Sequence, residues 1–342
     1  MTFSGNVFVT GGAGFIGSHC CKMLNASGFS PVVYDNLVTG HRDAVKWGEL
    51  FEGDIREHQK LNEALAATNP IAVIHLAASA YVGESVIDPD KYYGNNVVGM
   101  HSLLSACRNQ NIGNFIFSSS CATYGIPTSD MIDESMDQRP INPYGRTKLI
   151  GEQMLEDFAH AYGMRFGILR YFNASGADVE GEISERHEPE THLIPRVLMA
   201  ASGAIPEIEI FGTDFPTPDG TCIRDYIHVV DLANAHVLAL QHLLLQRANF
   251  KVNLGTGRGH SIREIVAAVE KIAGRGVPAV FKPRRFGDPP RLVANVDFAR
   301  STLGFRARYS DIGTIIRTSA PFFGLVIPSR ELNISPGPSG LG

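Results

Sequence analysis

The stretch of residues 7–18, VFVTGGAGFIGS, decides how this chain folds. Its first four residues are β-branched or aromatic and predict a buried strand. Glycines follow at once, and the apolar pattern beyond them is typical of a helix. Glycine lets the backbone adopt positive φ and approach a ligand closely, and a helix start offers unpaired N–H groups to an anion. The stretch therefore predicts a strand–turn–helix unit that holds a diphosphate.

An acidic residue further along makes this turn a dinucleotide fingerprint. The turn fits G-x-G-x-x-G at residues 12–17, and Gly11, Gly14 and Gly17 fit the related G-x-x-G-x-x-G. Either pattern alone is weak evidence. Asp35 ends the second expected strand, where its carboxylate would accept hydrogen bonds from ribose hydroxyls and repel a 2′-phosphate. The cofactor predicted from these residues is NAD rather than NADP.

Three polar residues at strand ends have two interpretations each. Asp35 with Asn36 also fits a loop-capping turn, although the upstream glycines favour the ribose contact. Asp54 would either meet the adenine edge or close a strand-end turn, and the sequence leaves both open. His75 lies in an apolar run, which favours a satisfied buried histidine over a ligand or a base.

Composition excludes several classes of protein. The 342 residues suffice for one large or two small domains, and 30 Lys and Arg against 35 Asp and Glu imply no basic face for nucleic acid. Five cysteines without C-x-x-C spacing argue for a reducing compartment and against a zinc site. We see neither a secretory leader nor an apolar run of about 18 residues. We expect a cytoplasmic protein that binds no metal and contacts no membrane.

Strand-like and helix-like segments alternate through the first half of the chain. Strands are expected at residues 7–10, 31–34, 71–76, 115–118 and 166–170, with another ending near 53–55, and helices at 18–28, 57–68, 90–109 and 143–162. This alternation predicts an α/β fold, a doubly wound, Rossmann-like parallel sheet with helices on both faces and right-handed crossovers.

The second half is mixed. Helices are expected near residues 193–202, 231–245 and 261–273, the last with a Ser261–Glu264 capping box, and strands near 208–211 and 250–254. We expect residues 1–172 to form an NAD-binding domain, which a return segment near 225–257 joins. Residues 173–320 would form a smaller mixed α/β substrate domain. Residues 321–342, rich in Pro, Gly and Ser, would be an irregular tail that packs poorly.

Tyr144 and Lys148 share one face of the expected helix 143–162. A free phenol, with a pKa of about 10, is a poor base at neutral pH, but a nearby ammonium and a positive nicotinamide ring favour phenolate. A tyrosine packed on a lysine stem has the same spacing. Ser120 favours the catalytic interpretation, because ligands bind outside the carboxyl ends of parallel strands. The two serines before it equally fit a strand-end turn.

Several segments together resemble the extended short-chain dehydrogenase/reductase family, and within it the enzymes that invert C4 of UDP-sugars. They span roughly residues 5–318 and are TGGAGFIGSH at 10–19, DNL at 35–37, GDIR at 53–56, VGES at 82–85, YYGNN at 92–96, FIFSSSCATYG at 115–125, YGRTK at 144–148, LRYFN at 169–173, RDYIHV at 224–229, NLG at 253–255 and RRFGD at 284–288. The cofactor motifs are shared widely, whereas RYFN, RDYIHV and RRFGD are much narrower.

The resemblance implies a tightly held NAD that is regenerated in each cycle. Tyr144 would remove the proton of the sugar 4-hydroxyl while C4 passes hydride to NAD, Ser120 would bind that oxygen, and Lys148 would hold the ribose and tune Tyr144. The 4-keto sugar would then turn over and take hydride back on its other face. The implied reaction interconverts UDP-glucose and UDP-galactose, with UDP-N-acetylglucosamine or a UDP-pentose as alternative substrates.

The resemblance also implies binding residues and an assembly. The implied cofactor contacts are Gly11, Gly14, Phe15, Ile16, Gly17, Asp35, Asn36, Asp54, Ile55, Leu76, Ala77, Ala78, Asn95, Ser118, Tyr144, Lys148 and Tyr171. The implied substrate contacts are Ser120, Tyr144, Asn173, His192, Leu193, Arg224, Arg285, Asp288 and Leu292. Arg224 and Arg285 suit a diphosphate, with a surface ion pair as the alternative for either one. A homodimer would form through helices 90–109 and 143–162.

Three departures from the family pattern concern the substrate and the end of the chain. Ala80 stands where many relatives have a lysine that contacts the cofactor, and Leu292 where some have a tyrosine that closes the sugar pocket. The smaller Leu292 leaves room for N-acetylated sugars, and the loops near 78–83 and 188–195 look like those of a subgroup with UDP-pentose epimerases. Pro321 breaks a helix that relatives continue.

Rival functions are disfavoured by one residue type that the sequence lacks and by others that it contains. A dehydratase or decarboxylase of this fold has an acidic residue just after the serine segment, where residues 121–123 are Cys, Ala and Thr. A net reductase would exchange NADPH, which Asp35 disfavours. A non-catalytic dinucleotide sensor commonly lacks both Tyr144 and Lys148.

Overall fold

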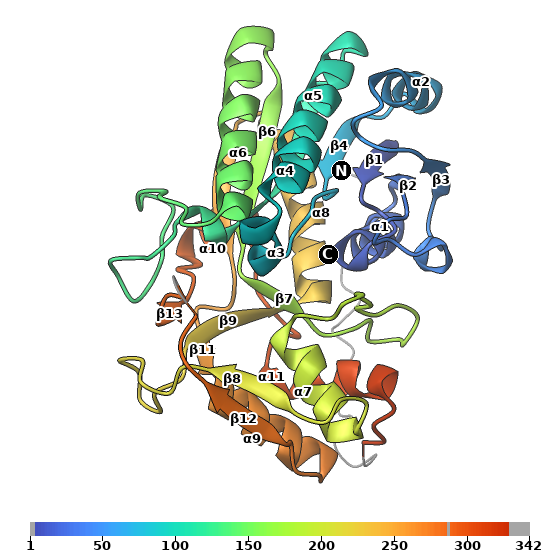
Figure 1. The fold of residues 1–342 in the computed structure, drawn as a ribbon. Helices are drawn as coiled ribbons and strands as arrows, with labels where there is room; N and C mark the ends of the chain where they lie inside the picture. Colours follow the sequence, from blue (N-terminus) through green and yellow to red (C-terminus); the bar gives the residue numbers. More distant parts are fainter. Residues whose placement is uncertain (1–3, 286–287, 328–342) are drawn as a thin grey trace.

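The computed structural model describes residues 4–285 and 288–327, and its central sheet has seven parallel strands. Their order is β10-β6-β5-β4-β1-β2-β3, which reverses direction between β1 and β4 and makes the sheet doubly wound, as predicted (Figure 1). The strands are β1 (Asn6–Thr10), β2 (Ser30–Asp35), β3 (Glu49–Glu52), β4 (Ala72–His75), β5 (Asn114–Ser120), β6 (Arg165–Tyr171) and β10 (Phe250–Leu254).

Helices cover both faces of the sheet because its strands carry apolar side chains on both sides. Along β1, Val7 and Val9 enter the core beneath α1 and α8, whereas Phe8 enters the core beneath α2, α5 and α6. The covering helices are α1 (Phe15–Ala26), α2 (His58–Thr68), α5 (Gly99–Asn109), α6 (Pro143–Tyr162) and α8 (Val229–Gln246).

A smaller assembly lies beyond the carboxyl ends of the large sheet (Figure 1). Strand β9 pairs with β7, β11 and β13, and β8 pairs with β12. The smaller strands are β7 (Asn173–Ser175), β8 (Ile208–Phe211), β9 (Ile223–His228), β11 (Gly259–Ser261), β12 (Ala279–Lys282) and β13 (Arg291–Leu292). The helices here are α7 (Leu193–Ser202), α9 (Ile262–Ala273) and α11 (Ile312–Ser319), while α10 (Asp297–Leu303) packs near β10. Ser261 caps α9 in the predicted capping box.

Two helix predictions need correction. The first helix begins at Phe15 rather than Ser18, so part of the glycine turn lies inside it. The long helix expected at residues 90–109 is interrupted: α4 (Pro89–Tyr92) passes through a π-helical turn at Tyr93–Val98 before α5 begins, and a short α3 (Val82–Ile87) precedes it. A π turn lets a helix change its facing, and here it brings Asn95 and Asn96 toward the loop after β4.

The beginning of the expected tail, residues 321–327, is irregular and largely exposed, with Phe322 41% and Val326 91% exposed, and only Leu325 is buried. Helix α11 ends at Ser319, and a 3₁₀ turn (Ala320–Phe323) follows at the predicted break. Leu325 beyond it is buried in the core formed with α7 and α9. Residues 328–342 lie outside the described residues. In the part of the chain that is described, no helix is both long and apolar enough to span a bilayer.

Candidate active site

The glycine turn is built by close backbone approach. Gly11 has a φ of 72°, and a Cβ on it would lie 2.6 Å from the backbone nitrogen of Ala77. A Cβ on Gly17 would lie 2.0 Å from the carbonyl oxygen of Gly11. Gly14 precedes α1 without any side chain capping the helix. The N–H groups of the first turn, at Phe15 to Gly17, are therefore not covered by a cap and can meet an anion.

Asp35 joins the end of β2 to this turn. Its carboxylate accepts hydrogen bonds from the backbone N–H of Ala13 at 3.0 Å and of Leu37 at 2.8 Å. Burial raises the pKa of this carboxyl, and the two hydrogen bonds oppose the shift. An ionised carboxylate has about four acceptor positions, so it can still accept from ribose hydroxyls. The loop-capping and cofactor interpretations of Asp35 are compatible.

Asn36 and Asp54 lie side by side at neighbouring strand ends. Asn36 Nδ2 donates to Asp54 at 3.0 Å, and Arg56 pairs with the same carboxylate at 2.7 Å. The Arg56 guanidinium lowers the pKa of Asp54 to about 2. Asp54 also accepts from the backbone N–H of Arg56 at 2.9 Å and so closes its own turn, while its expected contact with adenine stays a prediction. Ile55 beside it is a core residue.

The loop after β4 is held by the asparagines of the π turn. This loop contains the expected cofactor residues Leu76, Ala77 and Ala78. Asn96 accepts from the N–H of Ser79 at 2.8 Å and donates to Thr147 at 3.0 Å, while Asn95 donates to the Ser79 hydroxyl at 3.3 Å. Asn96 therefore links the loop to the helix turn that carries Lys148. Sequence reasoning missed this role, although the YYGNN segment contained the signal.

Ser120, Tyr144 and Lys148 come together at the carboxyl end of β5. Tyr144 is buried, and the Ser120 hydroxyl is near enough to its phenol to oppose the rise in its pKa. The Lys148 Nζ lies 6.0 Å from the centre of the Tyr144 ring and donates to the carbonyl of Ser118 at 2.8 Å. The fold therefore assembles the three residues that the sequence predicts as catalytic.

Burial controls the charges of this group. It raises the pKa of Tyr144 to about 12, which the hydrogen bond from Ser120 opposes, and it lowers the pKa of Lys148 to about 8, against the charge of Glu152. Loss of hydration thus sets the pKa of Tyr144 in the free chain, and the expectation that the ammonium and a bound nicotinamide favour phenolate stays a prediction. The phenol is neutral at pH 7 in this state.

Ser118 and Tyr171 lie behind this group. The Ser118 hydroxyl oxygen is 2.7 Å from His236 Nε2, and Tyr171, which ends β6, lies near the same hydroxyl. Both oxygens of Ser118 thus have partners inside the protein. The Ser118 carbonyl accepts a hydrogen bond from the Lys148 ammonium and so holds it in place, a role that the sequence did not indicate.

A buried ion pair anchors the same region. Glu152 and Arg170 are 1% and 2% exposed and pair at 2.7 Å. Ser119 donates to Glu152 at 2.5 Å, and Arg170 donates to the hydroxyl of Tyr124 at 2.9 Å, which donates in turn to Asn253 at 2.8 Å. This network joins β5, β6, β10 and α6. Sequence reasoning missed it because its members lie far apart along the chain.

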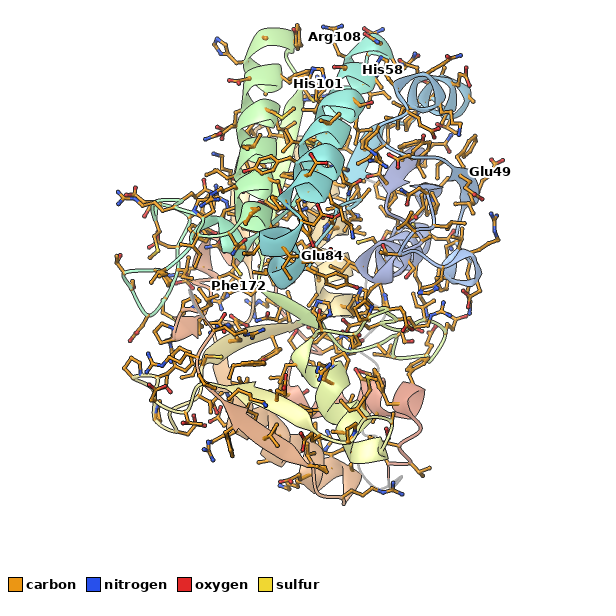
Figure 2. The ribbon with its side chains drawn as sticks, in the orientation of Figure 1. Glu49, His58, Glu84, His101, Arg108 and Phe172 are labelled. Atoms are coloured by element: carbon orange, nitrogen blue, oxygen red, sulfur yellow. The ribbon has the colours of Figure 1, made fainter. Side chains whose placement is uncertain are left out.

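The expected substrate residues gather around β9. Arg224 on β9 is paired in register with Leu292 on β13, and Asn173 on β7 donates to the carbonyl of Asp225 at 3.1 Å. The charge of Arg224 lowers the pKa of Cys121, the residue after Ser120, although burial raises it overall to about 12. Arg224 therefore lies near the catalytic strand end. Phe172, labelled in Figure 2, is buried where the large and small sheets meet.

Arg285 and Asp288 pair with each other at 3.1 Å, and the Arg285 guanidinium lies 4.6 Å from the centre of the Phe211 ring. Burial raises the pKa of Cys222, and the charges of Arg224 and Arg285 both oppose that rise. The two expected diphosphate arginines thus approach one site from distant segments. The sequence did not predict Phe211 as a residue of this site, and its contact with the Arg285 guanidinium places it there. Residues 286–287 of the RRFGD segment lie outside the described residues.

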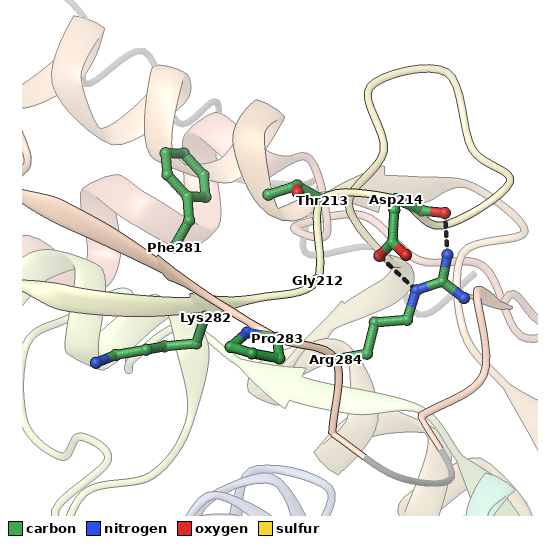
Figure 3. Close-up of a pocket in the computed structure, with 7 residues that line it drawn as sticks. All are labelled: Gly212, Thr213, Asp214, Phe281, Lys282, Pro283 and Arg284. Carbon is green, nitrogen blue, oxygen red and sulfur yellow. Dashed lines mark hydrogen bonds and ion pairs between the residues drawn. The ribbon is translucent and has the colours of Figure 1, made fainter.

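A surface hollow of about 430 Å³ lies at the ends of β8 and β12, beside Arg284 (Figure 3). Arg284 holds its rim by donating to the Asp214 carboxylate at 2.6 Å. The lining residues are Gly212, Thr213, Asp214, Phe281, Lys282, Pro283 and Arg284. None of them belongs to the Ser120 group, so this hollow is separate from the catalytic residues.

His192 and Leu193 lie at the start of α7. The imidazole of His192 is 2.9 Å from Glu190 and 2.9 Å from Glu185, and its ring centre is 6.1 Å from that of Tyr81. Burial opposes its charge, but the two carboxylates raise the pKa of His192 to about 10. Its side chain is thus engaged with acidic residues of its own loop, which the sequence did not predict.

A doubly wound sheet with a glycine turn, a strand-end aspartate and a Ser–Tyr–Lys group defines a nucleotide-cofactor-dependent enzyme. Residues 7–255 match the model of the NAD dependent epimerase/dehydratase family, and the chain belongs to this family.

Curated relatives and solved structures match this chain over almost its whole length. UDP-glucose 4-epimerase of Rhizobium meliloti is 53% identical, over 92% of this chain and 95% of the relative. The crystal structure of UDP-glucose 4-epimerase from Brucella ovis in complex with NAD is 60% identical, with a TM-score of 0.93 over 95% of this chain and 100% of that one. A Stenotrophomonas maltophila UDP-glucose 4-epimerase with bound NAD and formylated UDP-arabinopyranose is 38% identical, with a TM-score of 0.90 over 94% and 98% of the two chains.

Proposed function

We propose that this chain interconverts UDP-glucose and UDP-galactose by transient oxidation at sugar C4, using a tightly held NAD. The observation that carries the proposal is the meeting of Ser120, Tyr144 and Lys148 at the strand end beside the glycine turn. The names of the relatives support the substrate, and the absence of a carboxylate at residues 121–123 disfavours a dehydratase.

The residues of the cradle fit NAD. The uncapped start of α1 suits a pyrophosphate, and the close backbone contact at Gly17 leaves no room for a side chain there. Asp35 keeps acceptor positions for the adenine ribose, and a 2′-phosphate beside this carboxylate would be repelled. When bound, NAD supplies the acceptor and donor of the hydride at sugar C4.

Tyr144 moves the proton. As the phenolate, which the Lys148 ammonium and a bound nicotinamide would favour, its oxygen would take the proton of the sugar 4-hydroxyl while the C4–O bond becomes a carbonyl, and the resulting phenol would give the proton back when the carbonyl is reduced from the other face. Ser120, which lies beside Tyr144, would hold the same sugar oxygen. The Lys148 ammonium lies 6.0 Å from the centre of the Tyr144 ring, and the Ser118 carbonyl fixes it there.

The UDP group would be held by residues of the smaller assembly. Arg224 and Arg285 would pair with the diphosphate, assisted by Asn173, Asp288 and the start of α7. Because Arg285 pairs with Asp288 in the free chain, substrate phosphate would compete for this guanidinium. A firm hold on UDP with few contacts to the sugar lets the keto sugar turn over between the two hydride transfers.

Leu292 supports a wider range of sugars. It is half-buried against the cluster of Tyr124, Ile132 and Phe172, and its aliphatic side chain leaves more room than a tyrosine. The structure with formylated UDP-arabinopyranose concerns a relative, yet it makes a UDP-pentose a reasonable second substrate. UDP-N-acetylglucosamine is the other alternative.

The decisive experiment incubates the purified chain with UDP-galactose and no added cofactor, and measures UDP-glucose. Parallel assays use UDP-glucose, UDP-N-acetylglucosamine and UDP-xylose, and acid release measures bound NAD. We expect turnover without added NAD, and about 10²–10⁴-fold slower turnover in Tyr144→Phe with NAD retained. Tyr162→Phe, at the exposed far end of α6, is the control. No interconversion of any of the four sugars would refute the proposal.

The expected homodimer is also proposed rather than observed. Helices α5 and α6 lie side by side, as the dimer contact requires (Figure 1). Arg108 on α5 stacks over Tyr162 on α6, and His101 meets Phe158, so a partner would face a connected aromatic surface (Figure 2). Light scattering at micromolar concentration should give twice the 37.1 kDa chain mass, and a monomer would contradict this.

We propose a reducing compartment such as the cytoplasm for this enzyme. Support comes from the five cysteines, all of which are free thiols in the described part of the chain.

A further inference from the structure

One loop gathers two glutamates and two histidines outside the catalytic group. The loop leads into α7, and residues 185–192 read ERHEPETH. One ligating atom from each of Glu185, His187, Glu190 and His192 lies within 4.8 Å of every other. The two carboxylate side chains are only 5% and 8% exposed, and His187 is 18% exposed. We call these four residues the loop cluster.

The distances within the loop cluster fit a tetrahedral metal ion. His187 Nδ1 lies 3.2 Å from Glu185 and 3.5 Å from Glu190, and His192 Nδ1 lies 2.9 Å from each carboxylate. Zinc ligands at about 2.0–2.1 Å in a tetrahedron are about 3.3 Å from one another. Two imidazoles and two carboxylates suit Zn²⁺, whereas Ca²⁺ and Mg²⁺ take oxygen ligands.

Hydrogen bonding leaves the loop cluster incomplete. Within the described residues, Nδ1 of His187 is buried and has no partner in hydrogen-bond geometry, although both carboxylates are near. A metal ion would satisfy this nitrogen and the charges of both carboxylates. The neighbouring acidic group offers carboxylates alone and is occupied by the Lys22 ammonium, which lies 2.9 Å from Asp178 and 2.6 Å from both Glu180 and Glu182. In the loop cluster both histidines pair with the carboxylates, and a metal ion would take the place of their protons.

The surroundings of the loop cluster show what an ion there would hold in place. The His187 ring is 6.3 Å from that of Phe15, the first residue of α1, and 5.9 Å from that of Tyr81. The backbone N–H of His192 donates to Glu190 at 2.8 Å, which orients this carboxylate as outer contacts orient metal ligands. The loop cluster thus lies between the cofactor turn and the start of α7.

We propose that Glu185, His187, Glu190 and His192 bind one divalent transition-metal ion of the Zn²⁺ type. The ion fixes the loop between the glycine turn and α7. The His192 side chain is then a metal ligand, and the substrate contacts of this segment fall to Leu193 and the backbone. The expectation of a metal-free protein is replaced by this proposal.

Metal content and spectroscopy test the site without relying on activity. We expect the full chain, purified without chelator or metal-affinity resin and dialysed, to retain about one zinc per chain. Replacement by Co²⁺ should give the visible absorption of a tetrahedral cobalt site. Chelation should lower the melting temperature, and Zn²⁺ but not Mg²⁺ should restore it.

Variants identify the ligands. Glu185→Gln and His187→Gln should each weaken zinc binding more than about tenfold and lose both the cobalt absorption and the thermal response to Zn²⁺. His160→Ala, an exposed histidine in the last turn of α6, is the control and should keep all three. Bound NAD, measured by acid release, shows that a variant is folded. A chain that holds no zinc, and whose melting temperature ignores added zinc, overturns the proposal. So does a His187→Gln variant that is folded and retains the cobalt absorption.

Discussion

At the scale of single residues, the glycine turn depends on the absence of particular side chains. Four glycines occupy it, but Gly17 has the closest backbone contact, because a Cβ there would lie 2.0 Å from Gly11. Gly14 meets the same oxygen only at 3.3 Å. The repeated glycine pattern therefore contains positions with unequal demands.

Gly17→Ala should lose bound NAD and destabilise the fold by about 1–3 kcal/mol or more. The new Cβ would clash with the backbone of Gly11, which can move away only if the whole turn shifts. Acid-released NAD and urea unfolding measure the two effects. Gly113→Ala is the matched control, because a Cβ there meets nothing within 4 Å. Equal NAD content in the two variants would contradict this account of the turn.

The Glu152–Arg170 pair is the residue contact on which the region behind Tyr144 depends. Glu152→Gln removes the charge and keeps the size, leaving the guanidinium of Arg170 buried without its partner. We expect a loss of about 3–5 kcal/mol in the free energy of unfolding. Asp137→Asn breaks the exposed pair with Arg139 and should change stability little. A similar small loss in both variants would mean that the buried pair is not needed.

At the scale of elements, α6 carries two of the three catalytic side chains, and its start fixes where they point. Asn142 caps the helix by accepting from the N–H of Gly145 at 2.8 Å, and Pro143 opens it. Tyr144 lies in this first turn. The cap therefore links local sequence to the position of the catalytic phenol.

Asn142→Ala should lower the free energy of unfolding by about 0.5–2 kcal/mol, because one helix N–H loses its acceptor. Asn142→Asp keeps a capping oxygen and should retain the stability of the parent chain. Thermal unfolding of both variants provides the comparison. If Asp and Ala cost the same, the cap is not what stabilises this helix start.

Elements also show how far sequence patterns reach. The bounds of α6, α7, β8 and β10 are those predicted, since each has clear end signals or strong periodicity. The π turn before α5 was not predictable, because its sequence reads as ordinary helix. It arises where Asn96 must reach both Ser79 and Thr147. Such a demand comes from three segments and is visible in none of them.

At the scale of the whole molecule, four buried histidines control acid stability. Burial lowers the pKa of His19 and His236 to about 4 and of His75 and His228 to about 3. The unfolded chain binds these protons below a pH of about 6.5, whereas the folded chain does not until much lower pH. Their stabilisation is therefore complete above pH 6.5 and is lost as the pH falls toward 4.

Each of these histidines should contribute a slope of up to about 1.4 kcal/mol per pH unit between pH 6.5 and its folded pKa. Urea unfolding from pH 8 to pH 4 measures the slope. His75→Asn, which removes one such group, should reduce it by about one proton, while the exposed His160→Ala should leave it unchanged. A slope that is identical in His75→Asn and the parent chain would contradict the assignment.

The two assemblies of the molecule meet at the site. In the expected return segment, β9 belongs to the small sheet. The elements that follow it return to the large sheet: α8 packs on it and β10 is its edge strand. Arg224 on β9 thereby reaches the strand end that carries Ser120. The division into domains at residue 172 stays a prediction, and the roles of the site residues await the variants described above.

The sequence by itself determined the parts of this protein whose cause is local. The strand–turn–helix of residues 7–18, the aspartate that ends β2 and the one-turn spacing of Tyr144 and Lys148 each follow from neighbouring residues. The tertiary structure alone decided what depends on distant segments. It placed Arg170 beside Glu152, Ser118 beside His236 and Arg285 over Phe211. It also set the raised pKa of Tyr144 in the free chain, because loss of hydration depends on everything packed around a group, which no spacing along the chain records.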